Sequence, residues 1–502
     1  MLSRVIKSAL KPKAISPLIS RSLNLIVHTT TSPDDDSGLN IVTTFKNGLR
    51  VVSENKPGHF AGVGIYIQSG SRLSFKSTKL LSAEQVKEKI EQLGGNISCF
   101  SSRECIMYQA IVFPEAVSDA LSLLGQTIFN PTISLDEVEE VAGNIAWEIN
   151  DIKSKPDTYL PEVFHQVAYK NNTLGNPLLC PESQLIDLNV DNLRDFHTLS
   201  HSPENIVIAA IGVPHEDLIE MCEKSGFTTL KPLASSQVIS NRLDSVTDTK
   251  IPLKGRDATT LPVLLDFTQT PKYTGGIKFI KDEDAEFTSI LLGFESAGVL
   301  DEKNIYPYAT LHSLMGGGGS FSAGGPGKGM YTRLYTNVLN QYGFVESCQA
   351  FHHCYTDSGL FGISSSCRPG TEYNMLEIII SQLFSVFTPK RAHFISKLVG
   401  DTLTNLEVSR AKNMLKSNML MTAESRVAQL EDLGRQIQVL GKKTEPSQIA
   451  INVDNVTSKD ISNAAAKLLS RPVTLVVSGK SDEFMEIATA LLKNRGLILP
   501  KN

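Results

Sequence analysis

The chain has 502 residues, 41% of them hydrophobic, and a formal net charge of −5. A single hydrophobic core stops growing at about 250–300 residues, so this length predicts two or more globular domains. No apolar run reaches about 18 residues, which argues against a membrane span. The moderate acidity argues against a nucleic-acid partner.

Cysteine usage argues against a disulfide framework and against a thiolate zinc site. The seven cysteines are an odd number, and no two of them form a Cys-x-x-Cys pair. Such sparse, unpaired cysteines are typical of proteins from a reducing compartment.

The first 33 residues are typical of a mitochondrial transit peptide. They contain five Lys and Arg residues and no Asp or Glu. On a helical projection, the basic residues of segment 2–11 fall on one face and the apolar residues on the other, and Pro12 ends the helix. A basic, amphipathic, acid-free start indicates mitochondrial import. Its removal would change the formal net charge from −5 to −10.

After a polar linker at 34–40, the chain alternates strand and helix signals. An Asn47-Gly48 pair between apolar runs predicts a hairpin over 41–53, and a strand follows at 62–68. Ser82 and Gln85 form a capping box that begins a helix ending at Leu93. Two strands then lead to Phe113. Three helices are expected after them, at 115–129, 135–153 and 160–169.

The second half repeats this order of strands and helices after a segment of different composition. Residues 228–273 are rich in Ser, Thr, Pro and charge, so we interpret them as a domain linker with a strand at 262–267. Segments 92–99 and 341–348 are similar, and each lies between a helix and a hairpin, which indicates two domains of one fold. The elements expected in the second half are strands at 287–294, 343–352, 359–367 and 473–478, and helices at 304–315, 329–340, 372–388, 402–422, 424–440, 458–469 and 481–494.

A glycine-rich segment is the most specific local feature of the sequence. Eight of the fifteen residues from Gly316 to Met330 are glycine, which no core helix or strand tolerates. A phosphate-binding loop would require Ser or Thr after Gly327-Lys328, where Gly329 stands. A dinucleotide-binding loop would follow a strand, whereas a helix is expected here. A passive flexible linker is the remaining alternative.

This segment and its continuation at 331–340 resemble the α-subunit branch of the mitochondrial processing peptidases, non-catalytic members of the pitrilysin-like M16 metallopeptidase family. The likeness covers nearly all of residues 40–495. Its other most similar stretches are residues 94–109, 160–181, 355–364, 409–413 and 430–436.

The resemblance implies an α+β fold of two homologous pitrilysin-like domains. Each would be a mixed, mostly antiparallel sheet packed with helices, at residues 34–227 and 274–502, joined by the linker at 228–273. It also implies a heterodimer in the mitochondrial matrix, in which a β subunit carries zinc and cleaves the presequences of imported proteins. No cofactor is expected in this chain.

The family likeness further implies that the glycine segment grips the substrate. Glycine backbone offers N–H and C=O groups to an extended peptide. The residues expected to contact presequences are Gly316, Gly317, Gly318, Gly319, Ser320, Phe321, Ser322, Ala323, Gly324, Gly325, Pro326, Gly327, Lys328 and Gly329. Among acidic residues, Glu431 and Asp432 could pair with presequence arginines, although a solvated helix face explains them equally well.

A catalytic zinc site is not expected in this chain. Active members carry His-x-x-Glu-His on a helix and a distal Glu, and this sequence has no such motif. His197 and His201 are spaced i, i+4 with no acid between them, and we interpret them as surface histidines. His352 and His353 would point to opposite faces of a strand. Glu148 falls where the distal ligand would stand, but without two histidines it is an ordinary acidic residue.

The N-terminal domain also departs from the family pattern. About fifteen residues of the family, which carry the helix of the metal motif or its degenerate counterpart, should separate residues 69–72 from 75–78. Only Leu73-Ser74 intervene here. Either the domain repacks, or the sequence omits a segment. In both cases we expect no peptide hydrolysis by this chain alone.

Three functions are therefore compared. The first is the non-catalytic, presequence-binding subunit of the processing peptidase. The second is a related non-catalytic core subunit of respiratory complex III, which has no evident need for the glycine segment. The third is a self-sufficient zinc protease, which the missing metal motif opposes.

Overall fold

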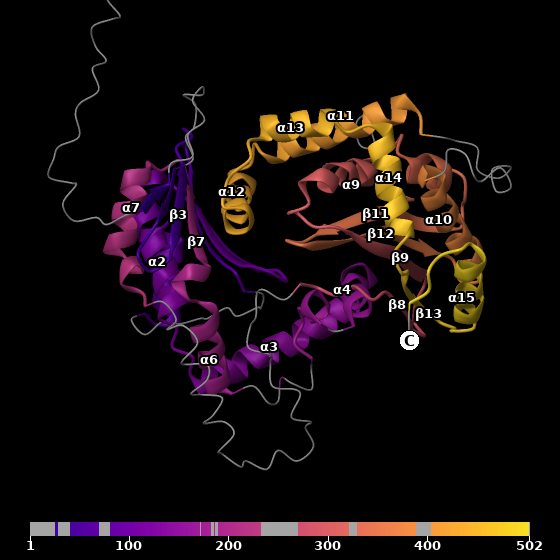
Figure 1. Cartoon of the computed structure of the whole chain (residues 1–502). Coiled ribbons are helices and arrows are strands. Elements are labelled where there is room, and N and C mark those ends of the chain that lie inside the picture. Colours follow the sequence, from indigo (N-terminus) through magenta and orange to yellow (C-terminus); the bar gives the residue numbers. More distant parts are fainter. Residues whose placement is uncertain are drawn as a thin grey trace, which may run out of the picture.

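Two mixed sheets, one in each half of the chain, organise the computed structural model (Figure 1). The structure describes residues 26–28, 41–69, 81–170, 172–181, 185, 189–231, 270–320, 329–387 and 403–500. The strand expected at 262–267 lies outside these residues. No helix in the described ranges is both long and apolar enough to cross a membrane.

The first sheet has seven strands and belongs to the N-terminal half. In spatial order they are β1 (Ile26–His28), β2 (Ile41–Thr44), β3 (Arg50–Glu54), β7 (Ile206–Ile211), β4 (Ala61–Ile67), β6 (Ile106–Val112) and β5 (Asn96–Ser101). The helices of this half are α1 (Ala83–Gln92), α2 (Val117–Phe129), α3 (Leu135–Lys153), α4 (Pro156–Tyr169), α6 (Val190–Ser200) and α7 (His215–Lys224). Short 3-10 turns lie at Pro114–Ala116, Thr173–Gly175, Pro203–Asn205 and Phe227–Thr229.

The second sheet has six strands and belongs to the C-terminal half. In spatial order they are β10 (Gly317–Gly319), β11 (Val345–Cys354), β12 (Ser358–Cys367), β9 (Thr288–Ala297), β13 (Thr474–Gly479) and β8 (Gly276–Lys281). The helices of this half are α9 (Glu302–Met315), α10 (Glu372–Phe387), α11 (Asn405–Thr422), α12 (Arg426–Leu440), α13 (Pro446–Asp454), α14 (Ser458–Leu469) and α15 (Phe484–Asn494).

The local signals that the sequence offers are realised in the N-terminal half. Strands β2 and β3 form the antiparallel hairpin, and Gly48 has the positive φ of 87° that its turn requires. Ser82 accepts from the Gln85 N–H while the Gln85 side chain accepts from the Ser82 N–H, as the capping box predicts. Strand β1 lies inside the predicted transit peptide, so removal of residues 1–33 would remove it.

The two sheets repeat one topology, which confirms the predicted pair of homologous domains. In the first sheet β3 runs parallel to β7, and the next neighbours β4, β6 and β5 are antiparallel. In the second, β8 runs parallel to β13, and β9, β12 and β11 follow antiparallel. Helices α3 and α11 both begin with a capping box, Ser134 with Glu137 and Thr404 with Glu407.

One helix of this repeat has no counterpart among the described residues. In the C-terminal half, α9 stands between β9 and β10 and packs against α11 and α14. In the N-terminal half the described chain passes from β4 to α1 without such a helix, and residues 70–80 lie outside the described ranges. This is the position at which the sequence is short.

The helix expected at 329–340 is present only over residues 333–339. Residues 333 and 334 are α-helical and lead into the π-helical turn η6 (Tyr335–Leu339), in which the Asn340 N–H donates to the Tyr335 carbonyl at 3.0 Å. Gly329 has a φ of +83°, and the Thr332 N–H closes a turn onto the Gly329 carbonyl at 3.0 Å. The left-handed glycine and this turn replace the first helical turns.

One face of each sheet is covered by helices from the same half of the chain. Side chains alternate along the strands, so Val63 and Ile65 of β4 join one core with Leu121 of α2 and Leu218 of α7. In the C-terminal half, Leu292 of β9 lies in a core that includes residues of α9, α10, α14 and α15.

The opposite face of each sheet is covered by a helix from the other half (Figure 1). Leu430, Leu433 and Ile437 of α12 pack on the N-terminal sheet, against residues that include Tyr66 and Ile211. In exchange, α4 packs on the C-terminal sheet. Its contacts join Leu160, Val163 and Phe164 with Leu291, Leu360 and Val476.

Polar contacts fix the α12 helix in place. The Tyr66 hydroxyl donates to the Leu430 carbonyl at 2.7 Å. Beyond the helix, Lys443 forms an ion pair of 2.6 Å with Glu54, and both side chains are almost fully buried. Burial raises the pKa of the Glu54 carboxyl, but hydrogen bonds from Lys443 and Lys56 outweigh it and leave the pKa below its ordinary value.

Helix α12 can approach the sheet closely because Gly434 has no side chain. A Cβ atom at Gly434 would lie 2.2 Å from the Tyr66 ring. We therefore expect Gly434→Ala to lower the free energy of unfolding by about 1–3 kcal/mol through overpacking. Urea denaturation measures this value. The matched control is Gly143→Ala on α3, where a Cβ meets no atom within 4 Å and should be neutral or stabilise by up to about 1 kcal/mol. Equal stabilities for the two variants would contradict this packing.

Candidate functional site

The glycine segment lies at the exposed edge of the C-terminal sheet. The structure describes Gly316–Ser320 and Gly329 of the predicted substrate-binding residues, while Phe321–Lys328 lie outside the described ranges. Helix α9 ends at Met315, and Gly316 leaves it with a φ of +55°. The three following glycines form β10, the outermost strand of the sheet, antiparallel to β11. The sequence did not predict this strand.

Strand β10 directs alternate backbone groups away from the sheet. The Gly316 carbonyl accepts from the Ala350 N–H at 2.8 Å, and the Ser320 N–H donates to the Glu346 carbonyl at 2.7 Å. Because antiparallel residues alternate between the two sides, Gly317 and Gly319 point their N–H and C=O groups outward. Gly319 is exposed, and a Cβ at Gly318 or Gly319 would meet no atom within 4 Å. At Gly319 this edge therefore presents bare backbone.

Thr332 holds the two ends of the glycine segment together. Its hydroxyl accepts from the Gly317 N–H at 3.2 Å and donates to the Gly329 carbonyl at 2.7 Å. The next residue, Arg333, is buried and forms an ion pair of 3.0 Å with Glu407 of α11. Arg333 also donates to the Ser385 hydroxyl at 2.9 Å. The base of the segment is thus fixed to two helices.

The carboxylate of Glu407 both caps the start of α11 and binds Arg333. Burial raises the pKa of Glu407, but hydrogen bonds from the Thr404 backbone and from Arg333 outweigh it and hold the pKa below its ordinary value. The ionised form is thereby favoured. Thr332 and Arg333 could not be singled out from the sequence, because Gly317 and Glu407, which they bind, lie 15 and 74 residues away in the chain. The Thr404-x-x-Glu407 capping box was the readable signal for Glu407.

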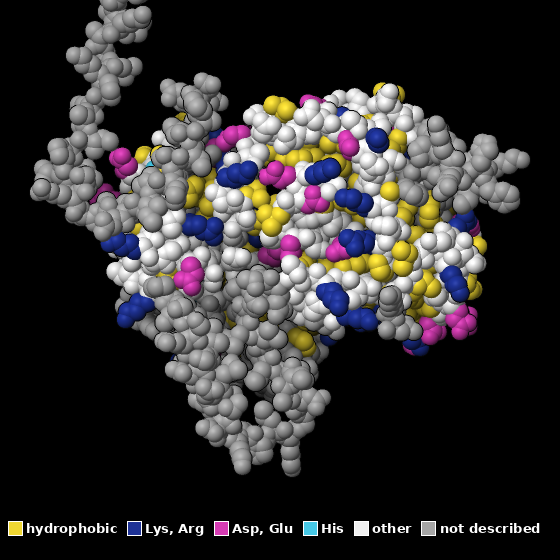
Figure 2. All heavy atoms as spheres, in the orientation of Figure 1, with side chains coloured by type: hydrophobic (Ala, Val, Ile, Leu, Met, Phe, Trp, Pro, Cys, Tyr) yellow, Lys and Arg dark blue, Asp and Glu magenta, His cyan; other side chains and the backbone are white. Residues whose placement is uncertain are grey.

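Exposed side chains flank the base of the segment. Tyr331 is 73% exposed, and the Arg410 guanidinium lies 5.5 Å from its ring centroid. Met330 is also exposed. On the face seen in Figure 2, charged side chains of both signs are intermixed with hydrophobic ones, so this face carries no patch of a single sign.

The two pairs of histidines discussed from the sequence pack against other aromatic rings. His201 is buried rather than at the surface, which corrects the sequence interpretation, and it stacks on the half-buried His197 with ring centroids 4.2 Å apart. Burial lowers the pKa of His201 to about 3. His352 and His353 face opposite sides of β11, as expected, since His352 contacts Tyr308 whereas His353 contacts His165.

No metal-binding cluster is formed by the described residues. Within them, no three His, Cys, Asp or Glu side chains come together as metal ligands. Glu148 lies on α3, as expected. All seven cysteines are free thiols.

The acidic candidates lie on the helix that joins the two halves. Residues 430–436, one of the stretches that carry the family resemblance, are part of α12. Glu431 is exposed, and Asp432 accepts from the Gln436 side chain at 2.9 Å. Asp432 is exposed as well, but partial desolvation raises the pKa of its carboxyl. Their pairing with presequence arginines stays a prediction.

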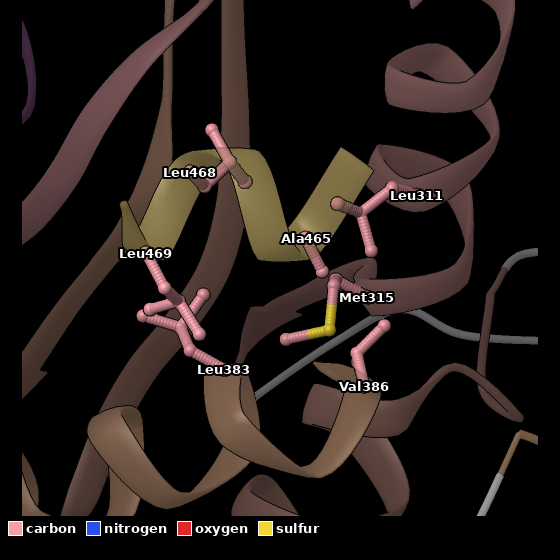
Figure 3. A pocket seen from close by; sticks show the side chains of 7 residues that line it. All are labelled: Leu311, Met315, Leu383, Val386, Ala465, Leu468 and Leu469. Carbon is pink, nitrogen blue, oxygen red and sulfur yellow. The ribbon is translucent and has the colours of Figure 1, made fainter. Parts of the chain in front are cut away.

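The pocket in Figure 3 belongs to the core and not to this edge. It lies between helices α9, α10 and α14, and every lining side chain is apolar: Leu311, Met315, Leu383, Val386, Ala465, Leu468 and Leu469. Such a lining offers no group for polar recognition or catalysis.

Comparisons with known proteins identify the family. A model described as Insulinase (Peptidase family M16) matches residues 71–182, and one described as Peptidase M16 inactive domain matches residues 187–387. The mitochondrial-processing peptidase subunit alpha of Neurospora crassa is 41% identical over 486 residues, covering 85% of this chain and 82% of that protein. The chain belongs to the M16 peptidase family, among the processing-peptidase α subunits.

Two further relatives extend the likeness. The probable mitochondrial-processing peptidase subunit alpha of Schizosaccharomyces pombe is 35% identical, over 92% of this chain and 90% of that protein. The subunit alpha of Homo sapiens is 32% identical, over 91% of this chain and 85% of that protein. These relatives support a subunit of a mitochondrial processing peptidase, located in mitochondria. They give no support to the complex III alternative.

The glycines of β10 differ in what they tolerate, which gives a test of the edge strand. A Cβ at Gly317 would lie 2.1 Å from the Cys348 carbonyl oxygen, and the φ there is +101°. Gly317→Ala should therefore break the pairing of β10 with β11 and expose the Gly318 amide to hydrogen exchange. Gly318→Ala is the control, because its Cβ enters open space. Equal amide protection at position 318 in both variants would rule out this strand.

Proposed function

We propose that this chain is the non-catalytic, substrate-binding subunit of the processing peptidase in the mitochondrial matrix. It pairs with a β subunit that carries zinc and cleaves the presequences of imported proteins. The observation that carries the proposal is the bare backbone edge of β10. A presequence in extended form would add to this edge as a further strand.

Backbone recognition suits substrates that share little sequence. Main-chain hydrogen bonds give affinity in strand addition, whereas pockets for side chains give specificity. Strand β10 consists of glycines alone, so it presents no side chain that would select one sequence. Presequences share a basic, amphipathic character rather than a fixed sequence, and the acidic charge of this chain is compatible with them.

The division of labour between subunits rests on the sequence and the relatives. The sequence lacks His-x-x-Glu-His, so the general base and two zinc ligands of an active M16 peptidase are missing. The match to an inactive M16 domain fits a non-catalytic chain. The relatives are named as subunits, which supports a partner chain. Zinc would therefore be held by the β subunit.

The edge strand can be tested by removing one donor. Gly319→Pro removes the outward N–H, whereas Gly319→Ala keeps it and adds a Cβ in open space. One backbone hydrogen bond contributes about 0.5–1.5 kcal/mol, so the proline variant should raise KM about 2- to 12-fold. The assay is cleavage of a basic presequence peptide by the chain reconstituted with a zinc-bearing β subunit.

The alanine variant should retain the KM of the unmodified chain. Thermal unfolding of both variants establishes that the fold is unchanged. If the proline and alanine variants have the same KM and the same unfolding temperature, presequences do not bind through this edge.

A further inference from the structure

The hydroxyl of Thr332 accepts a hydrogen bond from a backbone N–H of β10 that an incoming peptide could otherwise use. Gly317 and Gly319 are the two residues of β10 whose backbone groups point outward. The Gly317 N–H donates to the Thr332 hydroxyl at 3.2 Å. Within the described part of the chain, the outward N–H of Gly319 therefore remains as the donor of this strand for an incoming peptide.

Thr332 is itself held rigidly. Its side chain is buried, with 7% of the residue exposed. Its carbonyl accepts from the Thr336 N–H at 2.9 Å, and its own N–H donates to the Gly329 carbonyl at 3.0 Å. A hydroxyl fixed in this way keeps the Gly317 and Gly329 ends at a constant separation.

The methyl group of Thr332 fills the space between those ends. A Cβ at Gly316 would lie 2.4 Å from Thr332 Cγ2, and a Cβ at Gly329 would lie 3.7 Å from it. The side chain thus has two separable parts, a methyl group that packs and a hydroxyl that binds both ends.

We propose that Thr332 is a positioning residue for presequence binding. Its hydroxyl holds the ends of the glycine segment together and reserves the Gly317 N–H, so that an incoming strand pairs with Gly319. This inference rests on the proposed function of the β10 edge. Thr332 does not touch the substrate; it acts through the glycines that do.

Two variants separate the parts of the side chain. Thr332→Val keeps the packing and loses the hydroxyl, whereas Thr332→Ser keeps the hydroxyl and loses the methyl group. In the complex reconstituted with the β subunit, the valine variant should raise KM for a presequence peptide about 3- to 10-fold with kcat unchanged. The serine variant should restore the KM of the unmodified chain.

A double variant distinguishes positioning from general destabilisation. If Thr332 acts through the edge strand, Thr332→Val should raise KM by a smaller factor in the Gly319→Pro variant than in the unmodified chain. The inference would be overturned if the valine and serine variants had equal KM values. It would also be overturned if the KM increase of the double variant equalled the product of the increases caused by Thr332→Val and Gly319→Pro separately. If Gly319→Pro alone has no effect, the proposed function fails first. If it raises KM and Thr332→Val does not, only the positioning role fails.

Discussion

The exchange of helices between the two sheets is the contact on which the rest of the structure depends. Each sheet has apolar side chains on both faces, and in the described part of the chain one of these faces is covered by a helix of the other half, α12 or α4. Burying one large apolar side chain contributes about 1.5–3 kcal/mol, so either sheet would lose much of its stability without its partner. The halves are homologous in topology, and each supplies a helix that buries part of the other half's sheet. The sequence match at residues 430–436 therefore lies in a segment with a structural task, the docking of α12 on Tyr66.

This arrangement places the described start of the glycine segment, strand β10, at a fixed edge of the sheet, where Gly319 is exposed to solvent. The C-terminal sheet is covered by α4 on one face and by its own helices on the other, so β10 extends from a rigid scaffold. Thr332 and the Arg333–Glu407 pair then set where the segment begins and ends. The peptide-binding role proposed for β10 would benefit from this order, because a pre-organised edge loses less conformational entropy on binding.

Local signals in the sequence predicted most elements, and long-range contacts account for the misses. The capping box at Ser82 and the Asn47-Gly48 turn act within a few residues, and both are confirmed. Strand β10 was missed because glycine has no strand preference; its pairing with β11 comes from tertiary structure. The same reason hides Thr332, whose partner Gly317 is fifteen residues away. The burial of His201 could not be read from its spacing to His197.

A reconstitution in which binding and cleavage are followed separately tests the proposed division between binding and catalysis most directly. A fluorescently labelled basic presequence peptide is added to the purified chain, to a zinc-bearing β subunit, and to their mixture. If this chain is the non-catalytic binding subunit, it binds the peptide on its own without cleaving it, and cleavage requires the mixture. Zinc-dependent cleavage by the chain alone, or an unchanged KM when the β subunit acts without this chain, would contradict it.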